Sequence, residues 1–289
     1  MKFCILANPK KYSVQEPLEQ VINWCKNNRV YLSVSSELQH HFSSILDHSS
    51  VTITVTEEEA VKNADYIISI GGDGTMLHTA QLMKPRSIPV LGINTGKLGF
   101  MANIQPESIE KALDAIKEKN YILDKRYLLK AKLSDGEEFY ALNEFLFSKK
   151  DTSSMITLQA EYDGIFINNY WADGLLVSTP TGSTAYNLSA GGPIVLPNTP
   201  ILLLTPINPH TLTTRPLVLP SDRPLVIKSE TESINTLFSY DGKVVSTDDK
   251  LKVEITCSDY FIELIQFPDQ NYFETLRGKL MWGLDKRED

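Results

Sequence analysis

Cysteine is scarce in this chain, with three among 289 residues. Cys4, Cys25 and Cys257 are odd in number, lie far apart and lack the spacing of metal-ligand motifs. This pattern argues against a disulfide framework or a cysteine-bound metal and predicts reduced thiols in a cytosolic protein. We expect each thiol to be buried for structural reasons.

Positively charged residues are also fewer than negatively charged ones. The chain has 28 Lys and Arg residues against 36 Asp and Glu residues, which gives a formal net charge of −8. Nucleic acid and anionic membrane favour basic surfaces, so the charge argues against both as main partners. A small nucleotide is still compatible with it, because a local site can bind an anion through backbone dipoles and a metal ion.

Long hydrophobic runs are missing as well. No apolar run approaches the roughly 18 residues that a membrane-spanning helix needs. The longest candidate, Ile201 to Ile207, has only the length of a strand, and residues 1–7 are too short for the apolar part of a signal peptide. We therefore expect a cytoplasmic protein without a membrane partner.

The first part of the chain alternates between short apolar runs and helical patterns. This alternation is typical of βαβ units on a parallel sheet, and the length favours about two domains. The predicted strands are 3–7, 30–34, 51–55, 66–70 and 88–93, and the predicted helices are 18–25, 37–46, 60–64, 76–83 and 107–120. The sequence thus predicts an α/β domain over residues 1–120.

After residue 121 the pattern changes to two-residue alternation and Asp-Gly pairs. Asp135-Gly136, Asp163-Gly164 and Asp241-Gly242 each lie between β-rich runs, which is a hairpin signal. The predicted strands are 126–133, 139–148, 156–162, 165–171, 224–229, 237–240, 244–247, 251–257 and 261–267. We expect an all-β domain over 121–270, organised as a β-sandwich. A C-terminal helix within 271–289 is expected to pack back on the first domain.

The stretch Gly71-Gly72-Asp73-Gly74-Thr75 follows a predicted buried strand and precedes a predicted helix. Glycines leave room for a close backbone approach, and a helix N-terminus offers unpaired N–H groups. This combination predicts a phosphate site. No Lys follows the glycines, so the stretch is not the P-loop pattern.

Asp73 is the unusual member of this stretch, because it places an anion where another anion should bind. A divalent cation between the two would remove the repulsion, as would proton transfer to the carboxylate from an attacking hydroxyl group. Both solutions indicate phosphoryl transfer. The alternative is that Asp73 and Thr75 only cap the helix, since both residue types are common at N-caps.

A second unusual stretch runs from Asp173 to Pro193. It is rich in glycine and small hydroxyl residues, which predicts a binding loop rather than a core segment. Small hydroxyl side chains supply hydrogen bonds without bulk, Tyr186 offers an aromatic face for a base, and Gly191-Gly192 permits close backbone approach. A nucleotide would suit such a loop.

Taken together, these motifs resemble those of the NAD kinase family. The motifs that carry the resemblance, in chain order, are Gly71–Thr75, Asn94–Phe100, Asn143-Glu144, Asp173–Pro193, and Pro209-His210 with Arg215-Pro216. Gly-Gly-Asp-Gly alone is shared with lipid kinases of the diacylglycerol type, whereas the block from Asp173 to Pro193 is specific.

The resemblance implies transfer of the γ-phosphoryl group of ATP to the adenosine ribose 2′-hydroxyl of NAD, which gives NADP. It implies a divalent cation, for which we expect Mg²⁺. The sequence shows no side-chain cage for this ion and leaves its ligands open, with Asp73 and the phosphates as candidates. It also implies a Rossmann-like N-terminal domain, a β-rich C-terminal domain, and homodimers or homotetramers in which a neighbouring subunit contributes to the NAD site.

The resemblance also assigns roles to individual residues. Asp73 would be the catalytic base or a metal-linked carboxylate. The donor phosphates would be held by Gly71, Gly72, Gly74 and Thr75. Asn143 and Glu144 would bind ribose hydroxyls, and Asp173 would lie near the nicotinamide side. The adenosine would be surrounded by Thr184, Ala185, Tyr186 and Ser189.

One departure from the family is Trp171, where many members carry Arg two positions before the Asp-Gly of the long block. An aromatic ring there could stack on a base or pack at a subunit interface. Two other functions are compatible with parts of this sequence. A lipid kinase would explain Gly71–Thr75, but the chain shows no basic patch or lipidation signal. A silent nucleotide sensor would not need Asp73, which makes phosphate binding harder.

Overall fold

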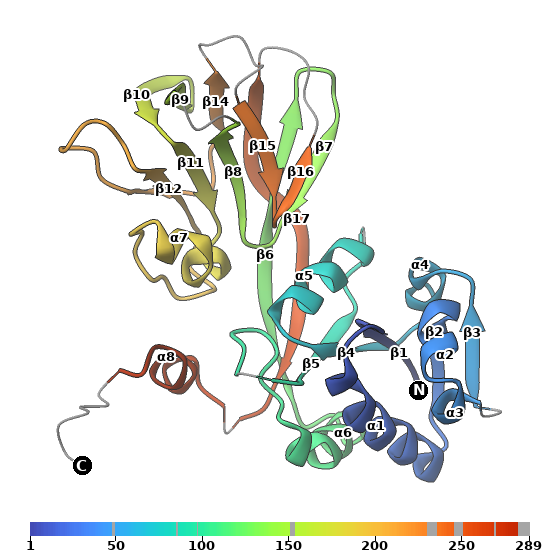
Figure 1. The fold of residues 1–289 in the computed structure, drawn as a ribbon. Helices are drawn as coiled ribbons and strands as arrows, with labels where there is room; N and C mark the ends of the chain where they lie inside the picture. Colours follow the sequence, from blue (N-terminus) through green and yellow to red (C-terminus); the bar gives the residue numbers. More distant parts are fainter. Residues whose placement is uncertain are drawn as a thin grey trace. The chain divides into compact units, whose positions relative to one another are not determined.

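The computed structural model describes residues 1–47, 50–84, 86–96, 98–150, 154–229, 236–245, 251–268 and 270–282. The chain divides into two compact units, unit 1 (Met1–Lys125 with Ile262–Asp289) and unit 2 (Arg126–Phe261). Both crossings fall inside long strands, β6 (Ile122–Leu133) and β17 (Lys252–Gln266) (Figure 1). The expected divisions at 120/121 and 270/271 lie near the ends of these two strands. Among the described residues, no helix combines the length and hydropathy needed to cross a membrane.

Unit 1 is an α/β domain around a parallel sheet with the strand order β17-β5-β4-β1-β2-β3. Its strands are β1 (Lys2–Ala7), β2 (Tyr31–Ser35), β3 (Val51–Thr54), β4 (Tyr66–Gly71) and β5 (Pro89–Asn94), followed by the end of β17. Its α-helices are α1 (Gln15–Asn28), α2 (Ser36–His41), α3 (Ser43–Leu46), α4 (Glu57–Val61), α5 (Asp73–Leu82), α6 (Ile109–Lys117) and α8 (Tyr272–Leu280). The short 3₁₀ turns are η1 (Tyr12–Val14) and η2 (Pro106–Ser108). The Rossmann-like fold is confirmed.

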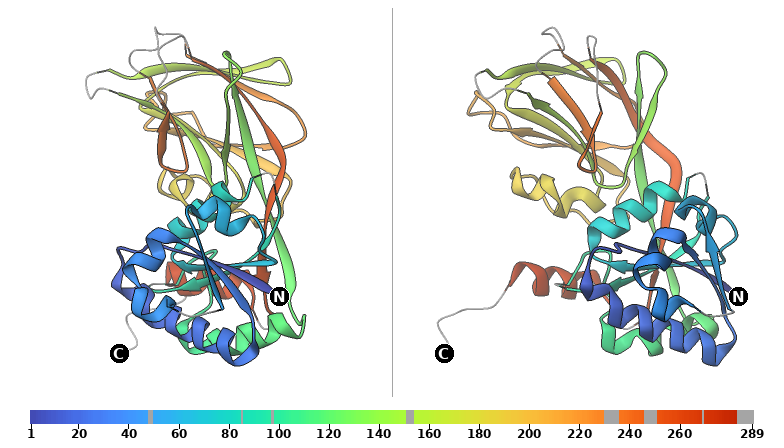
Figure 2. Two further views of the ribbon diagram at one scale, coloured as in Figure 1. Left: turned by 90° about the vertical axis from the view of Figure 1, so that its right-hand side faces the viewer. Right: turned by 45° about the vertical axis from the view of Figure 1, so that its right-hand side comes forward.

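Helices cover both faces of this sheet, because alternate strand residues point to opposite sides. One core contains Phe3, Ile5 and the buried side chains of α1 and α6, including Leu18 and Leu113. The helices α4 and α5 pack on the other face of the sheet (Figure 2). There the Thr79 hydroxyl donates to Ser69 Oγ at 3.1 Å. The two-faced burial explains why the strands are near-continuous apolar runs.

Unit 2 is a β-sandwich, as predicted. One sheet has the order β13-β12-β11-β8-β15-β16, and the other contains β10-β9-β14-β17 with β6 and β7. The strands are β7 (Glu138–Ala141), β8 (Glu144–Lys149), β9 (Ile156–Tyr162), β10 (Ile165–Ala172), β11 (Gly174–Ser178), β12 (Ile201–Ile207), β13 (Leu217–Pro220), β14 (Leu225–Ser229), β15 (Thr236–Tyr240) and β16 (Lys243–Val245). Between β11 and β12 lie η3 (Thr181–Thr184) and α7 (Tyr186–Ser189). Side chains from both sheets, such as Phe145, Leu158 and Phe238, share one buried core.

Three predictions about unit 2 were wrong. The run 139–148 is two strands in different sheets, because the chain leaves one sheet at Leu142 and enters the other at Glu144. The runs 251–257 and 261–267 form the single strand β17. Residues 174–178 are not part of a surface loop; they form β11, a fully buried strand between β8 and β12. Part of the predicted strand 244–247 lies outside the described residues.

The other sequence predictions fare better. The helix predicted over 37–46 is broken into α2 and α3, and the remaining predicted elements of unit 1 are present with shifted ends. The Asp163-Gly164 and Asp241-Gly242 turns have positive φ at both residues, as the two-residue hairpin requires. Cys4 and Cys25 are free and buried, and burial raises the pKa of each thiol to about 12. Cys257 is free but only partly buried.

Candidate functional site

The Gly71–Thr75 segment lies where the chain leaves β4 and enters α5. In the order β5-β4-β1-β2-β3, the strand order reverses between β1 and β4. Ligands of open α/β sheets bind outside the carboxyl ends of the strands at such a switch point. The fold of unit 1 therefore places this segment at the usual ligand position.

The glycines of this segment differ in whether the fold requires them. A Cβ on Gly71 would lie 2.1 Å from Thr75 Oγ1, so the turn itself requires glycine there. A Cβ on Gly72 or Gly74 would meet nothing within 4 Å. Neither of these two glycines is needed for packing, and their backbone is open to a ligand. Gly72 is the N-cap of α5 and has no side-chain cap, which leaves first-turn N–H groups for an anion.

Asp73 is held by a neighbouring loop and does not cap α5. Its Oδ1 accepts hydrogen bonds from the backbone N–H groups of Met101 (3.0 Å) and Ala102 (3.3 Å), and its Oδ2 accepts one from Phe100 (3.0 Å). A Cβ on Gly99 would lie 2.5 Å from Asp73 Oδ1, so the loop also requires glycine. The capping alternative is thus wrong, because the cap position belongs to Gly72. A carboxylate accepts about four hydrogen bonds, which leaves Asp73 acceptor capacity for a ligand.

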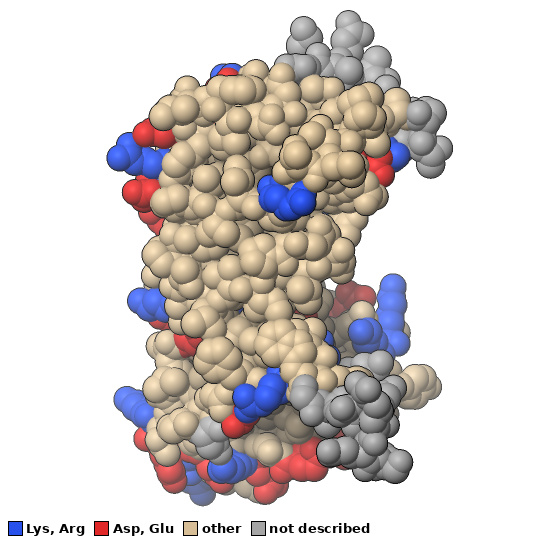
Figure 3. All heavy atoms as spheres, turned by 90° about the vertical axis from the view of Figure 1, so that its left-hand side faces the viewer, with Lys and Arg blue, Asp and Glu red and all other residues tan. Residues whose placement is uncertain are grey.

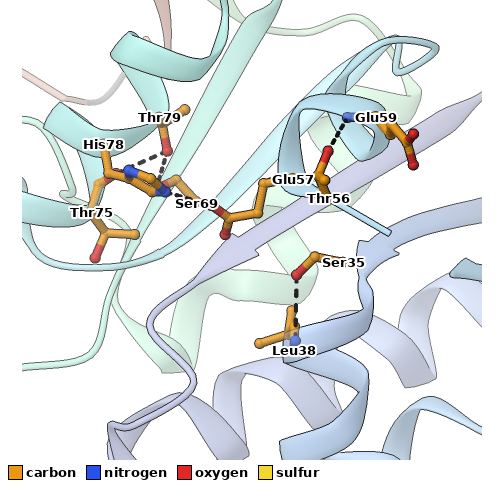
Figure 4. Close-up of polar contacts among 9 residues, drawn as sticks. All are labelled: Ser35, Leu38, Thr56, Glu57, Glu59, Ser69, Thr75, His78 and Thr79. Atoms are coloured by element: carbon orange, nitrogen blue, oxygen red, sulfur yellow. Dashed lines mark hydrogen bonds and ion pairs between the residues drawn. The ribbon is translucent and has the colours of Figure 1, made fainter. Parts of the chain in front are cut away.

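Polar contacts fix α5 on its sheet and against α4 (Figure 4). The Thr79 hydroxyl lies 2.9 Å from the Thr75 carbonyl oxygen, and His78 Nε2 lies 2.5 Å from Glu57 Oε2 on α4. Helix α4 is capped by Thr56, whose Oγ1 accepts from the Glu59 N–H at 3.3 Å. The contacts of Thr79 and His78 attach the middle of α5 to its sheet and to α4.

The loop after β5 holds Asp73 through its backbone N–H groups. Asn94 is buried, and its Oδ1 accepts from the Gly96 N–H at 2.8 Å. Helix α8 lies against the same loop: the rings of Tyr272 and Phe100 are 6.2 Å apart, and Lys279 Nζ is 5.3 Å from the centre of the Phe100 ring. The end of the chain therefore supports the loop that binds Asp73. Lys97 lies outside the described residues.

In unit 2, Asn143 and Glu144 lie at the start of β8 and are each 9% exposed. Burial, together with the neighbouring Asp241 carboxylate, raises the pKa of Glu144 to about 8. Among the described residues, buried side-chain polar atoms without a hydrogen-bond partner are Glu144 Oε2 and Thr181 Oγ1. Such atoms are rare in folded proteins because they are costly, which makes this place a candidate binding site.

The segment after β11 wraps around Asn143. Ser178 Oγ and the Thr179 N–H both donate to the Asn143 carbonyl oxygen, at 3.1 and 2.8 Å. Gly182 must be glycine here, because a Cβ would lie 2.2 Å from the same oxygen. These contacts bring the start of β8 and the segment after β11 together.

The predicted adenosine residues follow directly, on η3 and α7. The Tyr186 N–H interacts with the Glu144 carboxylate, while the Tyr186 side chain is 43% exposed. Thr184 and Ala185 are half-buried, and Ser189 is exposed at the end of α7. Asn187 is structural instead: its amide donates to the carbonyl oxygens of Ser183 and Pro193. The Tyr186 N–H thus lies beside Glu144, and Thr184, Ala185 and Ser189 are its neighbours on η3 and α7.

Asp173 lies at the other end of the same strands. Glu144 pairs with Ser178, whereas Ser148 pairs with Gly174, so about 13 Å of strand separates the two ends at roughly 3.3 Å per residue. Asp173 pairs with Lys149 (Oδ1 to Nζ, 2.6 Å) and accepts from Asn208 Nδ2 at 3.2 Å. The Lys149 hydrogen bond, followed by that of Asn208, lowers the pKa of Asp173. One copy of unit 2 therefore does not bring Asp173 to the Asn143-Glu144 pair.

Trp171, the departure from the family pattern, lies close to Asp173 in the chain and packs against His210. Its ring centre lies 4.1 Å from that of His210, and its carbonyl oxygen accepts from the His210 N–H at 2.9 Å. Trp171 is nevertheless 49% exposed.

The residues present suit a divalent cation that binds largely through its substrate. The described residues contain no group of three or more His, Cys, Asp or Glu side chains able to form a metal cage. Mg²⁺ typically needs only one or two carboxylates when phosphates and waters complete its shell. Asp73, next to the open glycine backbone, meets that requirement.

Sequence reasoning missed several residues of both sites. The N–H groups of Phe100–Ala102 give no side-chain signal, and Asp241 is indistinguishable in sequence from the hairpin residue Asp163. Thr181 lies within the long block, but only its burial without a partner separates it from its neighbours.

Known protein families and relatives show the class of protein to which this chain belongs. Residues 3–121 match the family model described as the ATP-NAD kinase N-terminal domain, and residues 142–267 match the ATP-NAD kinase C-terminal domain. The fold and the matches define a two-part nucleotide kinase. The NAD kinase of Flavobacterium psychrophilum is 37% identical over 297 residues, covering 99% of this chain and 100% of that protein. An NAD kinase of Bacteroides fragilis is 35% identical over 291 residues, with 99% and 100% coverage.

The chain belongs to the ATP-NAD kinase family, and its enzyme class is NAD kinase. Solved structures agree. Yeast NADH kinase complexed with NADH has a TM-score of 0.91 at 25% identity, covering 100% of this chain and 90% of that chain. The NAD kinase from Archaeoglobus fulgidus in complex with ATP has a TM-score of 0.75 at 27% identity, with 97% and 99% coverage.

Proposed function

We propose that this enzyme transfers the γ-phosphoryl group of ATP to the adenosine ribose 2′-hydroxyl of NAD and so forms NADP. The observation that carries the proposal is the buried Glu144 carboxyl group, whose Oε2 has no partner beside Asn143. Vicinal ribose hydroxyls are donors that would satisfy these acceptors. An ionised Glu144 would also repel a 2′-phosphate, which favours release of the product.

The donor is assigned to unit 1. The first-turn N–H groups of α5 and the open backbone at Gly72 and Gly74 would hold its phosphates. Thr75 and Gly71 shape this turn through their close contact. Asp73, oriented by the three N–H groups of Phe100–Ala102, would accept the proton of the attacking hydroxyl or hold the cation. A bound Mg²⁺ would neutralise charge on the transferred phosphoryl group.

We also propose a homo-oligomer in which Asp173 of one copy serves the nicotinamide side of another copy's site. Unit 2 exposes large apolar side chains on β10, on β13 and in the loop between β12 and β13: Ile165, Phe166, Trp171, Leu212 and Val218. Figure 3 shows a face on which few charged side chains lie over unit 2. Exposed apolar patches of this kind mark interaction surfaces. A cytoplasmic location is part of the proposal and follows from the reduced thiols and from the ATP and NAD substrates.

The test is NADP formation by the purified chain from NAD and Mg-ATP, read with an NADP-specific dehydrogenase. Parallel reactions use polyphosphate as donor, NADH as acceptor, or diacylglycerol in place of NAD. Phosphate on the 2′ position, located by NMR, supports the proposal. Phosphorylated diacylglycerol would show a lipid kinase, and NAD binding without NADP formation from any donor would show a sensor.

A further inference from the structure

The Asp241 carboxylate accepts hydrogen bonds from three consecutive backbone N–H groups. Its Oδ2 accepts from Leu142 at 2.8 Å, and its Oδ1 accepts from Asn143 at 2.8 Å and from Glu144 at 3.2 Å. The Asp241 N–H in turn donates to the Glu144 carbonyl oxygen at 3.1 Å. A residue of the β15–β16 turn thus clamps the point where the chain changes sheets.

The Asp241 carboxylate accepts hydrogen bonds from backbone N–H groups that neither sheet can pair. Leu142 and Asn143 lie between β7 and β8, so their N–H groups are outside both ladders. Buried N–H groups need acceptors, and the Asp241 carboxylate supplies them. The same geometry fixes the backbone from which the side chains of Asn143 and Glu144 project.

We propose that Asp241 is a positioning residue for the acceptor, holding Asn143 and Glu144 in the conformation that binds the NAD ribose. The proposal rests on the proposed function, since it assumes that this pair binds NAD. Asp241 acts through the pair and does not touch the substrate itself. It is expected to set both the geometry and the charge of the pair.

The charge effect gives the proposal a pH signature. The groups that act on the Glu144 carboxyl are the Asp241 carboxylate from the β15–β16 turn and the Tyr186 N–H from the start of α7. With a pKa of about 8, Glu144 is ionised in only about one molecule in ten at pH 7. If the ionised form accepts the ribose hydroxyls, NAD affinity rises up to about tenfold per pH unit until pH 8 and then levels off. Removing the like charge of Asp241 lowers the pKa of Glu144 and moves this break to lower pH.

The experiment measures NAD binding by calorimetry between pH 6 and pH 9 for the full chain and for Asp241→Asn. Asparagine has the size of aspartate, but its NH₂ group faces a backbone N–H, so two donors meet and one hydrogen bond is lost. We therefore expect about tenfold weaker NAD binding at pH 9, where Glu144 is ionised in both proteins. We also expect the NAD affinity of Asp241→Asn to level off at a lower pH than that of the wild type. The matched control is Asp163→Asn, because Asp163 lies in the same kind of Asp-Gly turn but pairs with Arg223 at 2.8 Å on the surface.

Wild-type affinity at pH 9 together with an unchanged break in Asp241→Asn would overturn the positioning role. Thermal unfolding shows whether that variant folds. Should it not fold, Asp241→Glu carries the test, because it keeps the charge but moves the carboxylate away from the three N–H groups: weaker NAD binding at pH 9 supports the positioning role, and wild-type affinity overturns it. The NADP-formation assay on the wild type tests a different claim. An inactive wild type would overturn the proposed function but would leave the positioning role of Asp241 standing.

Discussion

Gly74 offers a prediction in which stability and activity change in opposite directions. It lies in the exposed first turn of α5, where a Cβ would meet no atom within 4 Å. Alanine is favoured over glycine in helices by about 0.5–1 kcal/mol, and no clash offsets this gain. At about 2–4 °C per kcal/mol for a domain of this size, Gly74→Ala should raise Tm by roughly 1–4 °C.

The same substitution should impair ATP use. A methyl group on Gly74 would occupy the space through which a phosphate reaches the N–H groups of the helix. Loss of one hydrogen bond to a charged group costs about 1.5–3 kcal/mol, so KM for ATP should rise at least about tenfold. The assay is initial-rate NADP formation with ATP varied at saturating NAD, together with a thermal melt of each variant.

Gly278→Ala is the matched control. Gly278 lies within α8, and a Cβ there would make an ordinary contact with Leu98 Cδ2 at 3.4 Å. The control should gain similar stability and keep the wild-type KM for ATP. A Gly74→Ala enzyme with unchanged KM and kcat would refute the placement of the donor at this helix N-terminus.

Further predictions concern the two carboxylates and the exposed apolar residues. Asp73→Asn should keep NAD affinity while kcat falls at least about 100-fold, and a kcat near the wild-type value would contradict its catalytic role. The pKa of the Glu144 carboxyl group is raised to about 8, so the folded state keeps this proton to a higher pH than the unfolded state does. The contribution of Glu144 to the free energy of unfolding therefore falls as the pH rises from about 4.5 to 8. Glu144→Gln should therefore gain Tm relative to the wild type on going from pH 5 to pH 9, and an equal difference at both pH values would contradict it. Phe166→Asp should weaken self-association in sedimentation velocity, which an unchanged distribution would disprove.

Sequence alone determined much of the architecture. The alternation of apolar runs and helical patterns fixed the α/β character of unit 1, since burial on both faces of a parallel sheet requires it. Asp-Gly pairs located hairpins at Asp163 and Asp241, because few residues accept positive φ. The Gly71–Thr75 segment predicted a phosphate site from local chemistry alone.

Tertiary structure decided which partners these residues have. The donors to Asp73 are 27 to 29 residues away, and those to Asp241 are 97 to 99 residues away, so no local pattern could reveal them. They are also backbone N–H groups, which every residue type except proline carries. The burial of β11 depended on its position between β8 and β12, which its own polar and glycine-rich surroundings did not indicate. Local chemistry thus specified the turns and the phosphate loop, and long-range packing specified how each carboxylate is held.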